Sequence, residues 1–424
     1  MQRRKIVLAA YQCGPGLGSV SQIGWEWYSR LAREHEVTLV THVRNREALA
    51  AAGAPLAGSD VVYIDTEWFA GPLYRLSRKL FPFSEHSVFM LSSLDYFLCD
   101  FLAWRTLAAR MRAGARFSLL HRVTPITLAA PSWLGRLGLP VVLGPLNCGL
   151  GTPEGFGSVL KKDAVWLTRL RGVGQLAAAF SGATRHAARI LTATQSTLAS
   201  VPARHRPRCR MMVENGVDLE RFRDSVWPQP PSLTRPLRVL FVGRLVPFKG
   251  VGMLLEAAAL LTRGGQAIEV TVVGSGPMEP AWREQADALG IGPRVRFTGA
   301  LPAEQVAAEM AHCHVFCLPS VRESGGAVLL EAMACARPVI AVGFGGPAEI
   351  VDDEVGRLLA PLSAEQVTAD LAVALADVYR DPETWRRRGT AGRNRAVRRF
   401  SWPAKVAGAS AVYDELVRVE AAHA

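Results

Sequence analysis

The chain has 424 residues, of which 49% are hydrophobic and 20% charged, a composition that excludes a disordered polypeptide. Its length exceeds one ordinary core and predicts two or three domains. The 49 basic residues outnumber the 37 acidic ones to give a net charge of +12, which favours a nucleotide, another polyanion or an anionic membrane surface as partner. There is no basic arm, zinc-finger spacing or RNA-binding signature, so nucleic acid is not an expected partner.

The cysteines indicate reduced thiols rather than disulfides. They number seven, without a CxxC pair, and this pattern is typical of a cytosolic protein. Cys313 and Cys317, beside His312 and His314, could hold a metal, but "AHCHVFCLPS" reads as a helix end entering a buried strand, which favours core packing. No apolar stretch reaches the roughly 18 residues that a membrane span needs. "MQRRKIVLAA" is predicted as a first strand rather than a signal peptide.

The first half of the chain alternates short apolar runs with helical patterns. The helical pattern at 21–35 separates the first two runs and is predicted as an amphipathic helix. A strand–helix–strand rhythm of this kind predicts a doubly wound parallel sheet. The predicted strands are 5–10, 36–41, 60–65, 117–123, 140–146 and 189–194.

The segment 225–236, "SVWPQPPSLTRP", is rich in proline and lacks periodicity, so it is predicted as a linker. The strand–helix rhythm then restarts, with helices predicted at 251–264 and 281–290. The expected fold is therefore α/β, with two Rossmann-like domains whose parallel sheets face each other across a cleft. The predicted strands of this half are 237–243, 269–276, 295–299, 314–320 and 337–342. We draw the domains as 1–224 and 237–401, followed by an amphipathic helix, 402–424, that begins at Ser-Trp-Pro.

A glycine-rich loop, "YQCGPGLGS" at 11–19, follows the first predicted strand. Glycines such as Gly16 and Gly18 let the backbone approach an anion, and the next helix offers free N–H groups. The spacing does not match GxGxxG and no acid follows the second strand, so a dinucleotide oxidoreductase is not expected. A plain tight turn is the alternative interpretation.

Two later loops also carry glycines at strand ends. "VGRLVPFKG" (242–250) places Arg244 and Lys249 just after Gly243, and two cations at a strand's carboxyl end suit a diphosphate. Two surface cations on an ordinary loop are the alternative. "VVGSGP" (272–277) follows the next strand in the same way.

The stretch "ESGGAVLLEAMA" places two carboxylates, Glu323 and Glu331, around the predicted start of a helix. In one interpretation Glu323 caps the first helical turn and Glu331 is a solvated helix residue. In the other, both side chains point into one site, and the two glycines between them allow a ligand to approach the helix start.

These motifs occur in a fixed order: "GRLVPFKG", "VVGSGP", "FTGALP", "LPSVRESGGAVLLEAMACARPVIAV" and "GGPAEIV". Together they resemble the retaining glycosyltransferases of family 4, which have the GT-B fold, and the acidic pair matches the E-x7-E motif of that family. "ENGVD" (214–218) resembles the entry into the second domain. "GPGLGS" and "HRVTP" resemble a bacterial subgroup that acts on polysaccharides or glycolipids. The resemblance is dense over about 235–360 and looser before it.

The resemblance implies a role for individual residues. Arg244 and Lys249 would hold the diphosphate of the donor, Glu323 its sugar and Glu331 its ribose, while His121 would lie near the donor sugar. The predicted catalytic residues are therefore Glu323, Arg244, Lys249 and His121. A second set of residues would line the donor. That set is Glu331, Gly325, Gly326, Gly243, Gly16, Gly18, Gly299, Leu301 and Asn215.

The implied reaction uses a UDP- or GDP-linked sugar and a glycan or lipid-linked acceptor, with no metal and no other cofactor. Cations and helix N–H groups would stabilise the leaving diphosphate, and the family implies front-face retention of configuration. Ala336 stands where the family often has glycine, and "ESGG" lacks a common aromatic residue. A GT-B-like sugar-nucleotide epimerase or hydrolase, or a non-catalytic nucleotide-sugar-binding protein, remains an alternative.

Two segments mix cations with large apolar residues, 69–83 and 160–174. They suit the surface of an anionic bilayer, and an ordinary amphipathic helix on a protein core is the alternative. The expected location is therefore cytoplasmic and peripheral to the inner face of the membrane. In the resembled family the last helix returns to the first domain, and we expect the same of 402–424.

Overall fold

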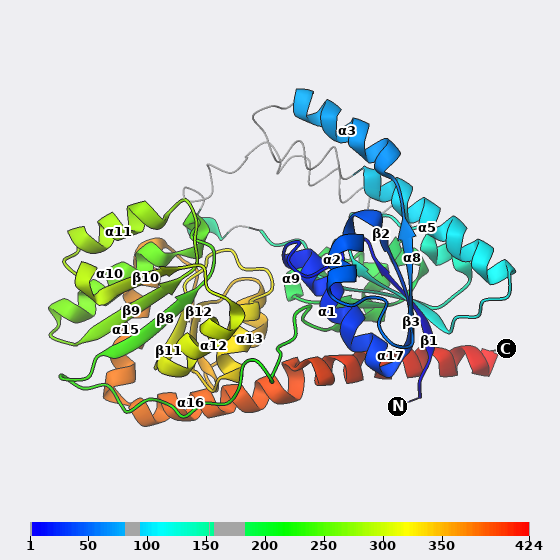
Figure 1. Ribbon diagram of the computed structural model, residues 1–424. Helices are drawn as coiled ribbons and strands as arrows, with labels where there is room; N and C mark the ends of the chain where they lie inside the picture. The colour runs from blue at the N-terminus through cyan, green and yellow to red at the C-terminus, as the bar shows by residue number, and fades with distance from the viewer. Residues whose placement is uncertain (1, 81–93, 152, 157–182, 424) are drawn as a thin grey trace. The chain divides into compact units, whose positions relative to one another are not determined.

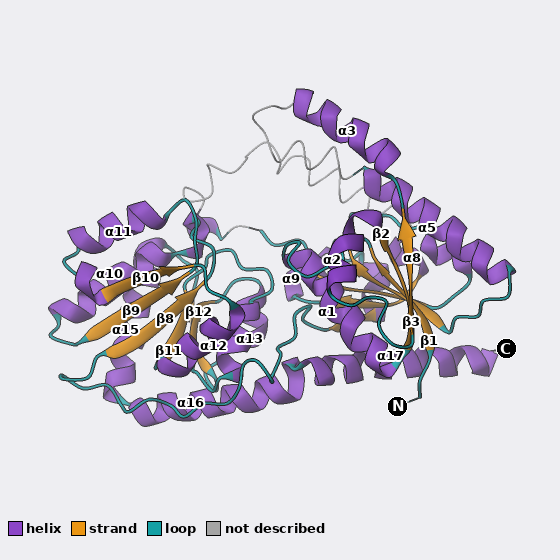
Figure 2. Cartoon of the chain, viewed as in Figure 1, coloured by secondary structure: helices purple, strands orange, loops and turns teal. Residues whose placement is uncertain are grey.

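The computed structural model describes residues 2–80, 94–151, 153–156 and 183–423. These residues form two compact units. Unit 1 contains 2–80, 94–149, 183–214 and 406–423, and unit 2 contains 150–151, 153–156 and 215–405. Each unit has its own parallel sheet with helices packed on it (Figures 1 and 2), as the strand–helix rhythm of the sequence predicts.

Unit 1 has a parallel sheet in the order β3-β2-β1-β4-β5-β6-β7. Its strands are β1 (Lys5–Ala10), β2 (Glu36–His42), β3 (Ser59–Ile64), β4 (Leu119–Thr124), β5 (Val141–Leu146), β6 (Ala187–Thr192) and β7 (Cys209–Met211). Its helices are α1 (Ser19–Glu34), α2 (Arg46–Ala51), α3 (Glu67–Leu80), α5 (Asp95–Arg112), α8 (Ala183–His186) and α9 (Gln195–Ser200), with α17 (Trp402–His423) reaching it at residue 406.

The strands of unit 1 are apolar runs because helices cover both faces of the sheet. Every residue of β4 and β5 is buried, and β1 is exposed only at Lys5. Val7 and Leu120, from neighbouring strands, pack with Leu107 of α5 in one core cluster. The chain proceeds from β1 outward to β3 and then returns to β4, so the strand order reverses between β1 and β4.

Unit 2 has a parallel sheet in the order β10-β9-β8-β11-β12-β13. Its strands are β8 (Leu237–Val242), β9 (Ile268–Val273), β10 (Val295–Gly299), β11 (Val315–Leu318), β12 (Val339–Val342) and β13 (Gly356–Leu359). Its helices are α10 (Val251–Arg263), α11 (Glu279–Ala288), α12 (Ala303–His312), α13 (Ala327–Ala334), α14 (Gly346–Ile350), α15 (Ala364–Arg380) and α16 (Pro382–Arg395).

The connections of unit 2 determine where a ligand can enter it. Helix α10 packs against α11 and α15, while α13 packs against α12 and α16. The strand order reverses between β8 and β11, so the loops that follow these two strands run to opposite faces of the sheet. Doubly wound sheets bind ligands at the carboxyl ends of the strands at such a reversal. The loops after β8 and β11 carry "GRLVPFKG" and "ESGG".

The predicted linker 225–236 contains no helix and no named strand, but its side chains are anchored on unit 2. Trp227 Nε1 donates to the carbonyl of His314 at 2.8 Å, and Arg337 donates to the carbonyls of Ser225 and Val226, each at 3.0 Å. The division between the units falls between residues 214 and 215, ten residues before the boundary that we drew from composition. Helix α17 belongs to unit 2 as far as residue 405 and to unit 1 from residue 406.

Candidate functional site

The loops at the carboxyl edge of the unit 2 sheet interlock through glycines. The amide of Gly243 donates to the carbonyl of Val273 at 2.9 Å, and that of Gly274 donates to Gly299 at 2.8 Å. A Cβ on Gly274 would lie 1.9 Å from the carbonyl oxygen of Gly243, so the loops after β8 and β9 touch by their backbones. Gly274 also has a φ of 130°, which disfavours any side chain. The loops after β8 and β9 and the carboxyl end of β10 therefore form one rigid rim.

The loop after β8 presents two cations. Arg244 is exposed, and no side-chain partner is found for its guanidinium in the part of the chain that the structure describes. Lys249 ends a short 3-10 turn, and Gly250 follows with a φ of 71°. A Cβ on Gly250 would lie 2.2 Å from the carbonyl oxygen of Pro319, which explains the glycine. The amide of Val321 donates to the carbonyl of Phe248 at 2.9 Å, so the loops after β8 and β11 are joined.

The two sequence-predicted residues Lys249 and Glu323 form an ion pair, with side chains that are only 15% and 14% exposed. The second carboxylate oxygen of Glu323, Oε1, accepts the N–H of Gly326 at 3.3 Å, and Gly326 is the residue that directly precedes α13. The backbone carbonyl of Glu323 accepts the N–H of Gly346 at 3.0 Å. Glu323 therefore does cap the helix start, and it does so from inside the predicted site. The two interpretations of this residue are compatible.

Glu331 lies on the second turn of α13 and is mostly buried. Burial raises the pKa of its carboxyl to about 7, while the positive charge of Arg221 acts in the opposite direction. Among the described residues its carboxylate has no hydrogen-bonding partner. A carboxyl group in this state is available to accept hydrogen bonds from a ligand.

Four more predicted residues of unit 2 lie at or after the carboxyl ends of its strands. Gly325 and Gly326 are buried at the start of α13, and Gly326 has a φ of 59°. Gly299 is the last residue of β10 and has a φ of 72°, and Leu301 follows the strand. Asn215 is the first residue of the longer segment of unit 2, and its role at the donor stays a prediction. No three histidine, cysteine or acidic side chains are grouped to hold a metal ion within the described ranges.

Three predicted residues belong to unit 1. Gly16 and Gly18, with φ values of 78° and 106°, are exposed in the loop after β1, and a Cβ on either would meet open space. His121 lies in β4 and is fully buried. Its Nε2 lies 2.6 Å from the carbonyl of Gly144, so it carries the proton, and its Nδ1 accepts from the hydroxyl of Tyr413 at 2.6 Å. A contact between His121 and a sugar would require one of these bonds to break, so its role near the donor stays a prediction.

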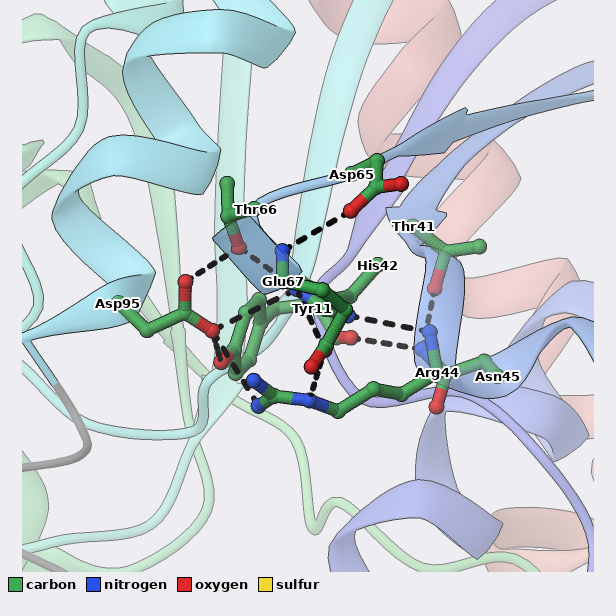
Figure 3. A network of polar contacts seen from close by, with 9 residues as sticks. All are labelled: Tyr11, Thr41, His42, Arg44, Asn45, Asp65, Thr66, Glu67 and Asp95. Atoms are coloured by element: carbon green, nitrogen blue, oxygen red, sulfur yellow. Dashed lines mark hydrogen bonds and ion pairs between the residues drawn. The ribbon is translucent and has the colours of Figure 1, made fainter. Parts of the chain in front are cut away.

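A polar network that the sequence did not reveal lies at the carboxyl ends of β1, β2 and β3 in unit 1 (Figure 3). Its centre is Asp95, which is completely buried at the start of α5. The carboxylate of Asp95 accepts hydrogen bonds from Thr66 Oγ1 and, at 2.8 Å, from the hydroxyl of Tyr11. Arg44 Nη1 lies 3.2 Å from the same carboxylate, and His42 Nε2 lies 3.4 Å from it.

The network is closed on itself. His42 Nδ1 accepts the N–H of Arg44 at 3.1 Å, and His42 Nε2 lies 2.7 Å from Thr66 Oγ1, so both ring nitrogens are engaged. Burial lowers the pKa of His42, in keeping with a neutral ring that donates from Nε2. A cavity of about 20 Å³ lies beside the network and is lined in part by Tyr11 and Arg122, which is room for about one water molecule and not for a sugar.

The two parallel-sheet units, with glycine-lined strand ends in both, define the GT-B class of α/β proteins. Residues 226–395 match the family described as glycosyl transferases group 1. In sequence, the chain is 29% identical to the GDP-mannose-dependent alpha-(1-6)-phosphatidylinositol monomannoside mannosyltransferase of Mycolicibacterium smegmatis, over 64% of this chain and 72% of that one. It is 36% identical to the D-inositol 3-phosphate glycosyltransferase of Corynebacterium glutamicum, over 43% and 44% of the two chains. For most of the curated relatives the match spans about half of their length or less.

Among solved structures, HepE from Anabaena in complex with UDP matches with a TM-score of 0.63 and 17% identity, over 97% of this chain and all of that one. WaaG, a glycosyltransferase involved in lipopolysaccharide biosynthesis, matches with a TM-score of 0.57 and 18% identity, over 97% and 99%. These likenesses bear on the fold, which is GT-B. The comparisons therefore agree with the glycosyltransferase resemblance that the motif order predicts: residues 226–395 match the group 1 glycosyltransferases, and the relatives named above are glycosyltransferases.

Proposed function

We propose that the protein transfers a sugar from a nucleoside-diphosphate sugar to a glycan or a lipid-linked acceptor. The observation that supports this most directly is the composition of the unit 2 edge. It combines an exposed cation at Arg244, a second cation at Lys249, the amide groups at the start of α13 and the mostly buried carboxyl of Glu331. Cations and helix amides suit a diphosphate, and a carboxylate without a partner suits the two hydroxyls of a ribose.

The proposed chemistry follows from where charge develops. The bond between the anomeric carbon of the sugar and the β-phosphate oxygen breaks, and an acceptor oxygen forms the new bond to that carbon. The proton of the acceptor hydroxyl passes to the departing phosphate, which leaves as part of the nucleoside diphosphate. Arg244 and Lys249 would stabilise the negative charge on this phosphate, a role in which preorganised donors are most effective. In this proposal the reaction retains the anomeric configuration and needs no metal ion.

Support for the substrate class comes from the relatives. One is a GDP-mannose-dependent enzyme that acts on a phosphatidylinositol monomannoside, and a structural neighbour is a complex with UDP. We therefore propose a UDP- or GDP-linked hexose as donor and an acceptor from glycolipid or polysaccharide synthesis.

Binding to nucleotides tests the proposal first. Isothermal titration of the full chain with UDP, GDP and ADP should show one diphosphate that binds in preference to the others. Incubation with UDP-glucose or GDP-mannose, with and without acceptor lipids, then distinguishes transfer from release of the sugar to water. Rapid hydrolysis without acceptor would favour the hydrolase alternative, and no nucleotide binding at all would contradict the proposed function.

A second part of the proposal concerns the membrane. Helix α3 (Glu67–Leu80) overlaps the predicted segment 69–83, of which residues 81–83 lie outside the described residues. The helix exposes Trp68, Tyr74 and Leu76 by 67%, 52% and 50%. Arg75, Arg78 and Lys79 are exposed on the same helix, and such a mixture of large apolar and basic side chains suits the interface of an anionic bilayer. The other predicted segment, 160–174, lies outside the described residues. No described helix is both long and apolar enough to span a bilayer. We propose peripheral binding at the cytoplasmic face of the membrane.

Flotation with vesicles tests this part. The full chain should float at low salt with vesicles that contain anionic phospholipid and not with neutral ones. The double variant Trp68→Ala/Leu76→Ala should lose most of this binding. Val226→Ala/Leu233→Ala is the matched control, since these two residues are 91% and 80% exposed on unit 2. Absence of flotation of the unaltered chain would contradict membrane binding.

A further inference from the structure

The Lys249–Glu323 ion pair occupies the position where a diphosphate would be expected to bind. Glu323 holds Lys249 through one carboxylate oxygen and the N–H of Gly326 through the other, at 3.3 Å. A cation and an amide at the start of a helix are the two groups that recognise a phosphate at such an edge. A carboxylate of the protein itself thus fills the anion position. Arg244, by contrast, is exposed.

The Lys249–Glu323 ion pair is largely shielded from solvent. Both side chains are about 15% exposed, so solvent screens their attraction only in part. The cap does not depend on the charge of Glu323, because a neutral amide oxygen at the same position can also accept the N–H of Gly326. The ion pair does depend on it. The two contacts of Glu323 can therefore be separated by substitution.

We infer that Glu323 is a specificity-determining residue that makes the site prefer the nucleoside-diphosphate sugar over the nucleoside-diphosphate product. This inference rests on the proposed function. A diphosphate can bind Lys249 only by displacing the carboxylate of Glu323 from it. When the donor sugar is present, the displaced carboxylate accepts hydrogen bonds from sugar hydroxyls. Once the sugar has been transferred, the carboxylate has no such partner, returns to Lys249 and competes with the β-phosphate, which promotes release of the product.

The inference predicts different changes in affinity for ligands with and without a β-phosphate. Replacement of Glu323 by Gln removes the competitor for Lys249 and retains an acceptor for Gly326. A nucleoside diphosphate and inorganic diphosphate should therefore bind the variant more tightly. A nucleoside monophosphate, which lacks the β-phosphate, should bind it as it binds the unaltered protein. The nucleotide sugar should gain little, since the variant loses a charged partner for the sugar hydroxyls.

The experiment is isothermal titration of the full chain and of Glu323→Gln with UDP and GDP, their monophosphates, UDP-glucose, GDP-mannose and inorganic diphosphate. We expect the Kd of the preferred nucleoside diphosphate to fall about tenfold in Glu323→Gln, and that of its monophosphate to change less than about twofold. Glu269→Gln is the control: Glu269 is exposed near the amino end of β9, at the opposite edge of the same sheet, and the substitution changes the net charge equally. A thermal melt verifies that each variant is folded.

The outcomes are distinguishable. If the unaltered chain binds a nucleoside diphosphate and Glu323→Gln binds it no more tightly, the inference is wrong and the proposed function stands. An equal gain for the monophosphate, or for Glu269→Gln, would reduce the effect to general electrostatics and also overturn the inference. If neither the unaltered chain nor the variant binds any nucleotide, the proposed function fails and the inference fails with it. Binding by Glu323→Gln alone would support the inference.

Discussion

The carboxyl edges of the two sheets are built from similar parts and use them differently. In unit 1 the buried charge of Asp95 is surrounded by Tyr11, Thr66 and Arg44, which direct their hydrogen bonds and charge inward. In unit 2 the guanidinium of Arg244 is exposed and the carboxyl of Glu331 has a pKa raised by burial. A closed network stabilises a fold, whereas groups left without partners at a sheet edge are available to a ligand. On this contrast we propose that the nucleotide binds to unit 2.

The strongest test of this assignment removes the exposed cation. Arg244→Ala should lower the rate of nucleoside-diphosphate formation from the preferred nucleotide sugar by about 100-fold to 1,000-fold, because a donor to the developing phosphate charge is lost. Its melting temperature should hardly change, since no described side chain pairs with Arg244. Arg263→Ala, at the exposed end of α10, is the control of equal charge. Unchanged turnover in Arg244→Ala would remove this residue from the site.

The second test breaks the rigid rim of unit 2. Gly274→Ala places a methyl group 1.9 Å from the carbonyl oxygen of Gly243 and strains a backbone with a φ of 130°. We expect a loss of about 3 kcal/mol in the free energy of unfolding of unit 2, measured by urea titration. Gly265→Ala has a φ of 80° but meets open space, and should cost about 1 kcal/mol. Equal effects would mean that the loops after β8 and β9 can separate freely.

The third test concerns the closed network of unit 1. Asp95→Asn replaces a buried carboxylate oxygen by an amide that cannot accept from Tyr11 and Thr66 together, and it leaves Arg44 without its buried partner. The expected cost is about 2 to 3 kcal/mol in urea unfolding. Nucleotide affinity should stay within about twofold, because in this assignment the nucleotide contacts unit 2 alone. Asp65→Asn, on an exposed residue, is the control. A stable variant with lost transfer activity would make the network a substrate site instead.

The smallest expected effect is a pH dependence. Burial raises the pKa of Glu331 to about 7, so the folded protein keeps this proton at pH values where an unfolded chain has released it. The free energy of unfolding without ligand should therefore fall between about pH 4.5 and pH 7. Binding to ribose hydroxyls favours the ionised form, and the affinity for the nucleotide sugar should drop about eightfold from pH 7.5 to pH 6.

The variant Glu331→Gln distinguishes the titration of Glu331 from that of other groups in the protein or the ligand. The nucleotide sugar is the suitable ligand, because it lacks the terminal phosphate that titrates near pH 6 in a nucleoside diphosphate. In Glu331→Gln the affinity should be lower at pH 7.5 and nearly independent of pH. An affinity of the unaltered chain that stays constant over this range would show that Glu331 does not bind the nucleotide in its ionised form.

The buried strands were predictable because parallel strands covered on both faces are continuous apolar runs, as in β1 and β5. Strand β7, "CRM", was missed because it is short and mostly exposed at the sheet edge. Helices α5, α15 and α16 were also not predicted. The loops that carry Arg244 and Glu323 were predictable from motif order. Their pairings were not, because Lys249 and Glu323 are 74 residues apart, and His121 and Tyr413 are 292 apart. Local pattern contains no information about such contacts.

The interlocked glycines of unit 2 also limit how this site can diverge. Because the backbones after β8, β9 and β10 support one another, an insertion or a bulky residue in one loop would displace its neighbours. Under the proposed function, a change of donor is therefore easiest through residues that take no part in these backbone contacts and do not bind the diphosphate, such as Leu301 after β10. Among relatives, the residues that bind the diphosphate should vary little, and those that contact the sugar and the base should vary more. A single scaffold can then acquire new donors by few substitutions.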